Sequence, residues 1–151
     1  EHPVYMKRND ESFISYKLNA LNANVHILSY YYAFVNATKD NIKQNELKFE
    51  GIPVVNEGSM NFTTIIPSGG QPSEVNLFID RVKNHETLKD TFYLTMEYLY
   101  KSKGNQTQTP MRKVYFVDHA NKQIRDVTSR EFYSVALFLK RNKIWSKFYD
   151  L

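Results

Sequence analysis

The sequence predicts an α+β fold in which one long N-terminal helix packs on a curved antiparallel sheet. Three observations lead to this prediction: an apolar stripe at helical spacing near the N-terminus, short β-rich segments after residue 40, and an alternating apolar pattern from Thr91 onward. The chain has 151 residues, of which 42% are hydrophobic and 15% aromatic, so it can bury a sizeable core. We expect a single globular domain over residues 1–151, because no linker-like segment divides the chain.

The expected helix covers residues 14–35 and is preceded by the cap candidates Asn9 and Asp10. No formally charged residue occurs between Leu18 and Thr38, but Asn, Ser and His interrupt the segment too often for a membrane span. We therefore interpret the run "SYYYAFVN" at residues 29–36 as the mostly buried end of this helix. The apolar stripe at alternating spacings of four and three consists of Ile14, Leu18, Leu21, Val25, Leu28, Tyr32 and Val35.

Short strands are expected after residue 40. Residues 47–52 alternate with period two, and residues 61–66 form a second candidate strand. The proline- and glycine-containing residues 67–72 predict a surface loop. Residues 74–84 fit either one face of a helix or a strand, and the sequence leaves both open.

A strand followed by a hairpin is expected in the next part of the chain. From Thr91 the side chains alternate, with Phe92, Leu94, Met96 and Tyr98 on one face. Met111–Asp118 and residues 123–127 predict a hairpin that turns through residues 119–122.

The last segment permits two interpretations. Thr128 and Glu131 have the spacing of a capping box, which predicts a helix from Ser129 to about Arg141. Alternatively, residues 132–139 are a buried strand whose partner strand follows from Ile144 to Tyr149. The alternation in residues 144–149 favours the hairpin.

This order of elements resembles the nuclear-transport-factor-2-like and cystatin-like architectures, in which a curved sheet wraps a helix. The ending "KIWSKFYDL" contributes to the resemblance, because the last strand of these folds often carries a buried tryptophan. The resemblance implies a small-molecule isomerase or dehydratase, a transport adaptor, or an extracytoplasmic domain of a conjugation or type IV secretion assembly. Enzymes of this kind tend to place an Asp–His pair inside the cone. No such pair lies on an apolar strand face in this sequence, which favours the non-enzymatic roles.

The sequence predicts no metal site and no cofactor. The chain has no cysteine, which excludes disulfides and thiolate ligands, and His2, His26, His85 and His119 have no metal-ligand spacing. We interpret His26 as lying on the polar side of the expected helix and Asp118 followed by His119 as a strand end and a turn. Gly69 and Gly70 lack a phosphate-binding pattern.

The chain start and the cysteine content bear on the compartment. The absence of cysteine argues mildly for the cytosol or for a bacterial chain that does without disulfides. The start at Glu1 indicates a chain processed or excised from a longer one, and we expect an extracytoplasmic or secreted domain without a transmembrane segment. Asn-x-Thr sequons at Asn36, Asn61 and Asn105 are about as many as chance gives in this asparagine-rich chain.

Acidic and basic side chains are unevenly distributed along the chain. Residues 1–100 carry nine basic and twelve acidic side chains, whereas residues 101–151 carry eleven basic and four acidic ones. Cations interleaved with aromatic rings suit an acidic protein partner, and they also suit the phosphates and bases of a single-stranded nucleic acid. The candidate binding residues in this part are Lys140, Arg141, Lys143, Trp145, Lys147 and Tyr149.

Three functions follow in order of preference. The first is a non-enzymatic protein–protein interaction module of a larger or exported protein, within an assembly. The second is a nucleic-acid-binding domain that uses the basic and aromatic C-terminal segment. The third is a small-molecule-binding or isomerase-like protein with a pocket lined by Tyr16, His26, Tyr31 or Tyr98.

Overall fold

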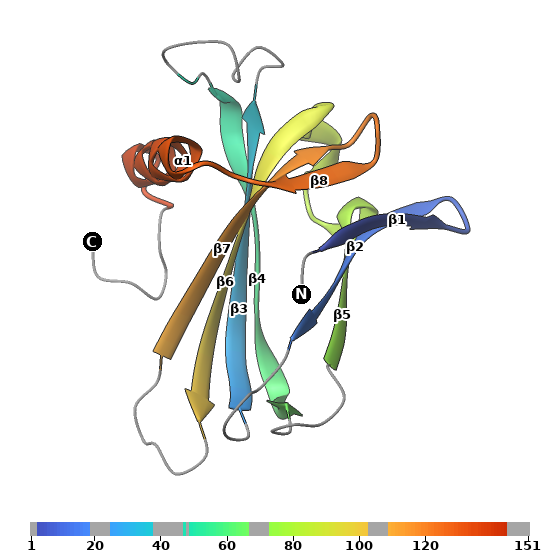
Figure 1. Ribbon diagram of the computed structural model, residues 1–151, viewed down its shortest axis with the longest axis vertical. Helices are drawn as coiled ribbons and strands as arrows, with labels where there is room; N and C mark the ends of the chain where they lie inside the picture. Colours follow the sequence, from blue (N-terminus) through green and yellow to red (C-terminus); the bar gives the residue numbers. More distant parts are fainter. Residues whose placement is uncertain are drawn as a thin grey trace.

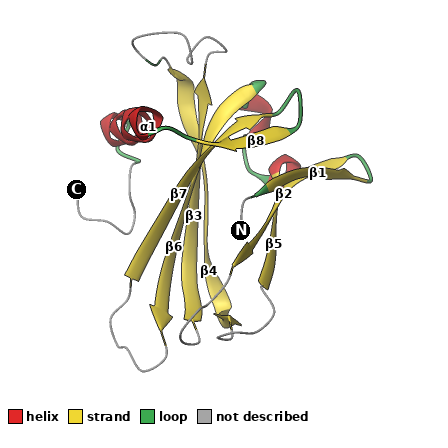
Figure 2. Cartoon of the chain, viewed as in Figure 1, coloured by secondary structure: helices red, strands yellow, loops and turns green. Residues whose placement is uncertain are grey.

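The computed structural model describes residues 3–18, 25–37, 47, 49–66, 73–102 and 109–144. These residues are mostly in strands, which form two antiparallel sheets, and the one α-helix among them is C-terminal (Figures 1 and 2). The expected fold class, with a long N-terminal helix on a curved sheet, is therefore wrong. The elements are β1 (Val4–Arg8), β2 (Glu11–Leu18), β3 (Val25–Ala37), β4 (Phe49–Ile66), β5 (Ser73–Phe78), β6 (Thr91–Ser102), β7 (Thr109–Asp118), β8 (Gln123–Asp126) and α1 (Ser129–Arg141).

The two sheets and the helix make three layers. The small sheet has the strand order β1-β2-β5, and the large sheet has the order β4-β3-β6-β7-β8. The small sheet packs on one face of the large sheet, and α1 packs on the opposite face (Figure 1). The large sheet therefore separates two hydrophobic cores.

Strand β6 shows how one strand serves both cores. Phe92, Leu94, Met96 and Tyr98 point into the core shared with the small sheet, whereas Tyr93 packs in the core under α1. This is the alternation expected from Thr91 onward, and the structure confirms it. The predicted hairpin is also confirmed, since β7 pairs with β8 in antiparallel register.

The expected N-terminal helix is replaced by β2 and β3. In the second half of β3, Tyr32 and Phe34 face the small sheet while Ala33 and Val35 face α1. A strand buried on both faces is apolar at nearly every position, so a helical spacing can be found in it by chance. The β-branched and aromatic residues of β3 are the signal that favours a strand.

The expected cap residues Asn9 and Asp10 form the turn of the β1–β2 hairpin instead. Both have positive φ angles, 52° and 64°, and Arg8 pairs with Glu11 across them. Two consecutive left-handed residues are typical of a tight hairpin turn, and Asn and Asp tolerate that conformation better than most residues.

The candidate strands at residues 47–52 and 61–66 both fall within the single long strand β4, which begins at Phe49. Pro53 does not interrupt it, because β4 is an edge strand and needs hydrogen-bond partners on one side only. The register shifts between Phe34 and Asn36, opposite Gly51, which has φ 72°. This bulge turns Ile52 outward, where it is 81% exposed. The loop predicted at residues 67–72 lies outside the described residues.

Of the two possibilities for residues 74–84, the strand is correct for the first part. Residues up to Phe78 belong to β5, and a 3-10 turn follows at Ile79–Arg81. A second 3-10 turn covers His85–Thr87.

The C-terminal hairpin favoured by the sequence is wrong, and the helical alternative is correct. Helix α1 begins with a full capping box: the Thr128 hydroxyl accepts from the Glu131 N–H, and the Glu131 carboxylate accepts from the Thr128 N–H. The alternation that favoured a hairpin lies beyond Ile144, outside the described residues.

Candidate functional site

Glu131 anchors the first turn of α1 to the large sheet. Its carboxylate accepts hydrogen bonds from both terminal nitrogens of Arg125, each at 2.9 Å, and from the Tyr93 hydroxyl at 2.5 Å. The Thr128 N–H donates to the same carboxylate at 3.0 Å. Burial alone would raise the pKa of Glu131, but these hydrogen bonds outweigh it and lower the pKa from 4.5 to about 2. Glu131 is therefore ionised, and its contacts serve to hold the helix.

This anchor fixes which face of α1 points outward. Val135 and Leu139 are fully buried on the inner side of the helix, and the Arg125 guanidinium lies 4.3 Å from the centre of the Phe116 ring. The outer side is left without a partner element among the described residues, as Figure 1 shows.

The outer side combines exposed apolar side chains with cations. Tyr133 is 71% exposed and Leu137 is 48% exposed, although both are large and apolar. Residues three and four apart share one face of a helix, so both lie in line with the exposed cations at either end. Glu131 is the one acidic residue of α1, and it is buried. We call this surface the α1 outer face and define it by Arg130, Tyr133, Leu137, Lys140, Arg141 and Lys143.

Two cations of the α1 outer face also stabilise the helix itself. Lys140 and Arg141 lie in the last turn of α1, where cations stabilise the helix dipole by about 0.3–1 kcal/mol each. Helix stability does not explain the exposed Tyr133 and Leu137, which contribute little to either core. These two side chains are the feature of α1 that the fold itself does not require.

Three of the six candidate binding residues lie on this surface. Lys140, Arg141 and Lys143 are exposed at the C-terminal end of α1, and their binding role stays a prediction. The other predicted residues, Trp145, Lys147 and Tyr149, lie outside the described residues. Arg130, Tyr133 and Leu137 were missed because the segment was interpreted as a strand. Their spacing of three and four would have placed them beside Arg141 on a helix.

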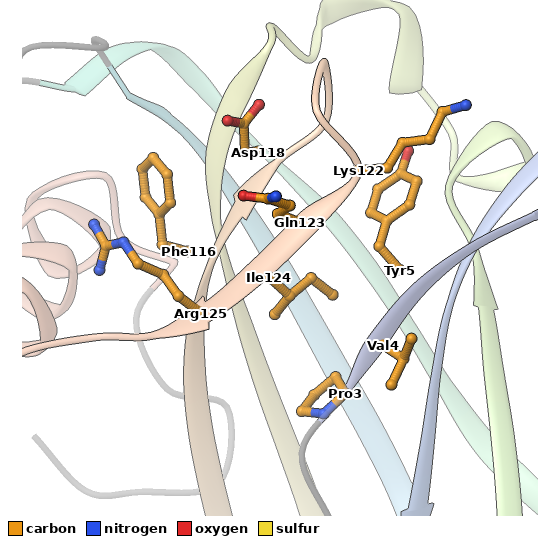
Figure 3. Close-up of a pocket in the computed structure, with 9 residues that line it drawn as sticks. All are labelled: Pro3, Val4, Tyr5, Phe116, Asp118, Lys122, Gln123, Ile124 and Arg125. Atoms are coloured by element: carbon orange, nitrogen blue, oxygen red, sulfur yellow. The ribbon is translucent and has the colours of Figure 1, made fainter.

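A groove of about 490 Å³ lies between β1 and β8, at the edges of the two sheets (Figure 3). Three of its polar side chains, those of Tyr5, Asp118 and Arg125, already have partners. The Asp118 carboxylate accepts from the main-chain and side-chain nitrogens of Asn121, at 3.1 and 2.8 Å, which confirms the predicted turn. The Tyr5 hydroxyl is hydrogen-bonded to Nδ1 of His119, and Arg125 binds Glu131. These three side chains are therefore engaged in contacts within the fold.

A second buried ion pair lies on the same face of the large sheet as α1. Arg112 donates to Oε1 of Glu97 through Nε at 3.0 Å and through Nη2 at 2.8 Å, and Glu97 is 1% exposed. The two residues are opposite one another on β6 and β7. Removal of either partner would leave an uncompensated buried charge, so we interpret the pair as structural.

Within the described ranges, no group of three metal-ligating side chains occurs, and no helix is long and apolar enough to cross a membrane. His26 lies in β3, so the interpretation that placed it on a helix is wrong, and its side chain is outside the described part. His2 is likewise outside that part.

The side chain of Asn36, the first residue of a sequon, is buried and hydrogen-bonded within the fold. Asn36 is 5% exposed; its Nδ2 donates to the Thr87 carbonyl at 2.9 Å, and its Oδ1 accepts from the Lys89 N–H at 2.8 Å. A glycan on Nδ2 would require this amide to leave its site, so the folded domain does not present Asn36 for glycosylation. Asn105 is not among the described residues, and neither is the side chain of Asn61.

No protein-family model matches the chain, and no curated protein or solved structure matches it. The class of the protein is therefore defined by its own geometry: the described part of the chain is mostly β, with two antiparallel sheets and one surface α-helix. The resemblance to nuclear-transport-factor-2-like and cystatin-like folds is supported only by the antiparallel sheets and the presence of a helix.

Proposed function

We propose that this domain is a non-enzymatic docking module that binds an acidic partner protein through the α1 outer face. The observation that carries the proposal is the exposure of Tyr133 and Leu137 in the middle of a surface whose charged groups are all positive. Exposed apolar side chains with a charged border are typical of protein interfaces, and Tyr and Arg are enriched among the residues that dominate binding energy.

The positive charge of the α1 outer face favours a negatively charged partner. Arg130, Lys140, Arg141 and Lys143 present four positive charges, and no exposed acidic side chain on α1 offsets them. A partner with carboxylates around an apolar patch would bury Tyr133 and Leu137 and pair with the cations. Opposite charges of this kind increase the association rate and exclude positively charged competitors.

A second copy of the chain is a poor partner for this face. A two-fold axis would pair α1 with α1 in either antiparallel or parallel order. In the first case Arg130 of each copy would approach Lys140 and Arg141 of the other, and in the second each cation would approach its own equivalent, so both arrangements bring like charges together.

The exposed apolar residues also favour a protein over a nucleic acid. Binding to a phosphate backbone depends on cations, and its affinity rises with the number of cations that reach phosphates. In α1 the central positions of the exposed face are Tyr133 and Leu137, and the cations lie at the ends. Leu137 would be left against phosphate or water. If the domain instead binds a nucleic acid, the test below would reveal it.

The test is a selection of random peptides displayed on phage against the wild-type domain. The same selection is run on the variant Tyr133→Ser/Leu137→Ser/Lys140→Glu/Arg141→Glu. A control, Lys83→Glu/Lys122→Glu, makes the same change in net charge at exposed cations away from α1.

We expect the wild type and the control to enrich peptides that combine Asp or Glu with apolar residues, and the α1 variant to lose them. If all three proteins enrich the same peptides, the α1 outer face is not the docking site. If the wild type enriches no peptide but binds a single-stranded oligonucleotide whose affinity falls as salt rises, the nucleic-acid function replaces this one.

A further inference from the structure

The core between the two sheets is unusually rich in tyrosine. The chain has eleven tyrosines, and seven of those in the described part belong to this core or pack against it. A purely structural core would use phenylalanine at most such positions, because each buried hydroxyl must find a hydrogen-bond partner. The seven are Tyr5, Tyr16, Tyr30, Tyr32, Tyr98, Tyr100 and Tyr115.

Three of these hydroxyls form a hydrogen-bonded chain in the interior. The Tyr32 hydroxyl is 2.5 Å from that of Tyr16 and 2.8 Å from that of Tyr98. The three side chains come from β2, β3 and β6, so the group bridges the two sheets. We call Tyr16, Tyr32 and Tyr98 the tyrosine triad; all three residues are at least nine-tenths buried.

The tyrosine triad has more O–H donors than it has hydrogen bonds. Each phenol has one O–H to donate, so three phenols have three, but the triad contains two hydrogen bonds. No further hydrogen bond from these hydroxyls to a described residue is present. One buried O–H donor is therefore left over, whichever way the two bonds point. A buried donor without an acceptor costs about 1–3 kcal/mol.

The triad lies beside a crevice. A space of about 250 Å³ between β3 and β5 is lined by Tyr30 and Tyr32 from β3, and by Val75, Asn76, Leu77, Phe78 and Arg81 from β5 and the turn after it. Tyr32 is thus both the centre of the triad and part of the crevice wall. If Tyr16 and Tyr98 both donate to Tyr32, the remaining proton belongs to Tyr32 itself.

We propose that this crevice binds a small, uncharged and largely apolar molecule whose carbonyl oxygen accepts a hydrogen bond from the tyrosine triad. The aromatic and aliphatic walls would hold the apolar body, and the unused O–H would fix its orientation. Ligand sites commonly combine apolar walls with a few polar groups, which here are Asn76, Arg81 and the triad hydroxyl. The volume is slightly below the usual range of about 300–1,000 Å³, which indicates a fragment-sized ligand. The inference is independent of the docking role of α1.

The surroundings favour an uncharged ligand over a carboxylate. Arg81, the cation that lines the crevice, already binds Glu11 at 2.9 Å and lies over the Phe78 ring. Burial raises the pKa of both Tyr32 and Tyr98, because the interior disfavours a phenolate. The same cost of desolvation would apply to a buried carboxylate.

The test compares three probes of similar size. Acetophenone carries the carbonyl oxygen, α-methylstyrene replaces that oxygen with a CH₂ group, and benzoate adds a charge. Each probe is titrated into the full chain and followed by NMR of the Val, Leu and Tyr side chains. We expect saturable shifts at Tyr30, Val75 and Leu77, with acetophenone binding about fivefold more tightly than α-methylstyrene, as one net hydrogen bond predicts. Benzoate should bind more weakly than acetophenone.

Two variants assign the preference to the triad. In Tyr32→Phe the preference for acetophenone over α-methylstyrene should disappear, whereas in Tyr30→Phe, which changes the same crevice outside the triad, it should remain. The wild-type probe pair tests the proposal even if Tyr32→Phe does not fold. Equal affinity for acetophenone and α-methylstyrene would show that no hydroxyl takes part. Absence of saturable shifts with any probe would show that water satisfies the spare donor and that the crevice is not a ligand site.

Discussion

Glu131 and Arg125 form a bidentate ion pair that joins the first turn of α1 to the edge strand β8 of the large sheet. Both carboxylate oxygens of Glu131 accept hydrogen bonds from Arg125, and the Tyr93 hydroxyl and the Thr128 N–H donate to the same carboxylate. One residue thus caps the helix, pairs with β8 and contacts β6. The orientation of the α1 outer face depends on it, so the anchor links the stability of the domain to its proposed function.

Replacing the anchor should therefore weaken the domain. We expect Glu131→Gln to lower the free energy of unfolding by about 2–3 kcal/mol, because it leaves a partly buried guanidinium without its carboxylate. Urea unfolding measures the change. Glu86→Gln is the control, since Glu86 is exposed and its loss should cost less than about 0.5 kcal/mol. Equal effects of the two substitutions would show that Glu131 is not an anchor.

The same carboxylate predicts a pH dependence. The pKa of Glu131 is lowered from 4.5 in the unfolded chain to about 2 in the folded domain. Its stabilising contribution is therefore complete above pH 4.5 and decreases as the pH falls toward about 2. The difference in unfolding free energy between wild type and Glu131→Gln, followed by urea unfolding over this range, should shrink with decreasing pH. A constant difference would mean that the charge of Glu131 is not responsible.

The proton count of the tyrosine triad predicts an order of stabilities. Tyr32→Phe removes both hydrogen bonds, whereas Tyr16→Phe removes one and leaves the bond between Tyr32 and Tyr98. We expect losses of about 2 kcal/mol and about 1 kcal/mol respectively, measured by chemical denaturation. If Tyr16→Phe is the more damaging substitution, Tyr32 is not the centre of the network.

Asn36 is predicted to stabilise the segment between the 3-10 turn and β6. Asn36→Ala removes one hydrogen bond to the Thr87 carbonyl and one from the Lys89 N–H in a buried setting, and we expect a loss of about 2 kcal/mol. Asn76→Ala, at an exposed position of β5, is the matched control and should be nearly neutral. A neutral result for Asn36→Ala in thermal unfolding would contradict the role assigned to this amide.

How far the sequence predicts this fold depends on how many faces of each element are buried. The β6 strand and the β7–β8 hairpin follow from local patterns that admit few alternatives. The capping-box spacing of Thr128 and Glu131 also indicated α1, but the alternation after Ile144 made the hairpin the preferred interpretation. The N-terminal half was misassigned because β3 is buried on both faces, and a continuous apolar run carries no unambiguous period. Only the pairing of β3 with β4 and β6, which is not local, decides its conformation.

The candidate sites also contain residues that local sequence patterns reveal and residues that only the folded structure brings together. The cations at Lys140, Arg141 and Lys143 were found from composition, but Tyr133 and Leu137 join them only once the segment is known to be a helix. The tyrosine triad joins residues that are distant in sequence, and its proton count requires the distances. A single sequence contains no signal for it.

The central claim is that an acidic partner binds the α1 outer face, and the most direct measurement is the affinity of a selected acidic peptide by fluorescence anisotropy. The wild type is compared with Lys140→Glu/Arg141→Glu and with the equal-charge control Lys83→Glu/Lys122→Glu. The account predicts a loss of about tenfold or more in the α1 variant alone, since cations beside the apolar centre contribute directly to binding. An equal loss in both variants, or none in either, would show that the peptide responds to overall charge or binds elsewhere, and would contradict the account.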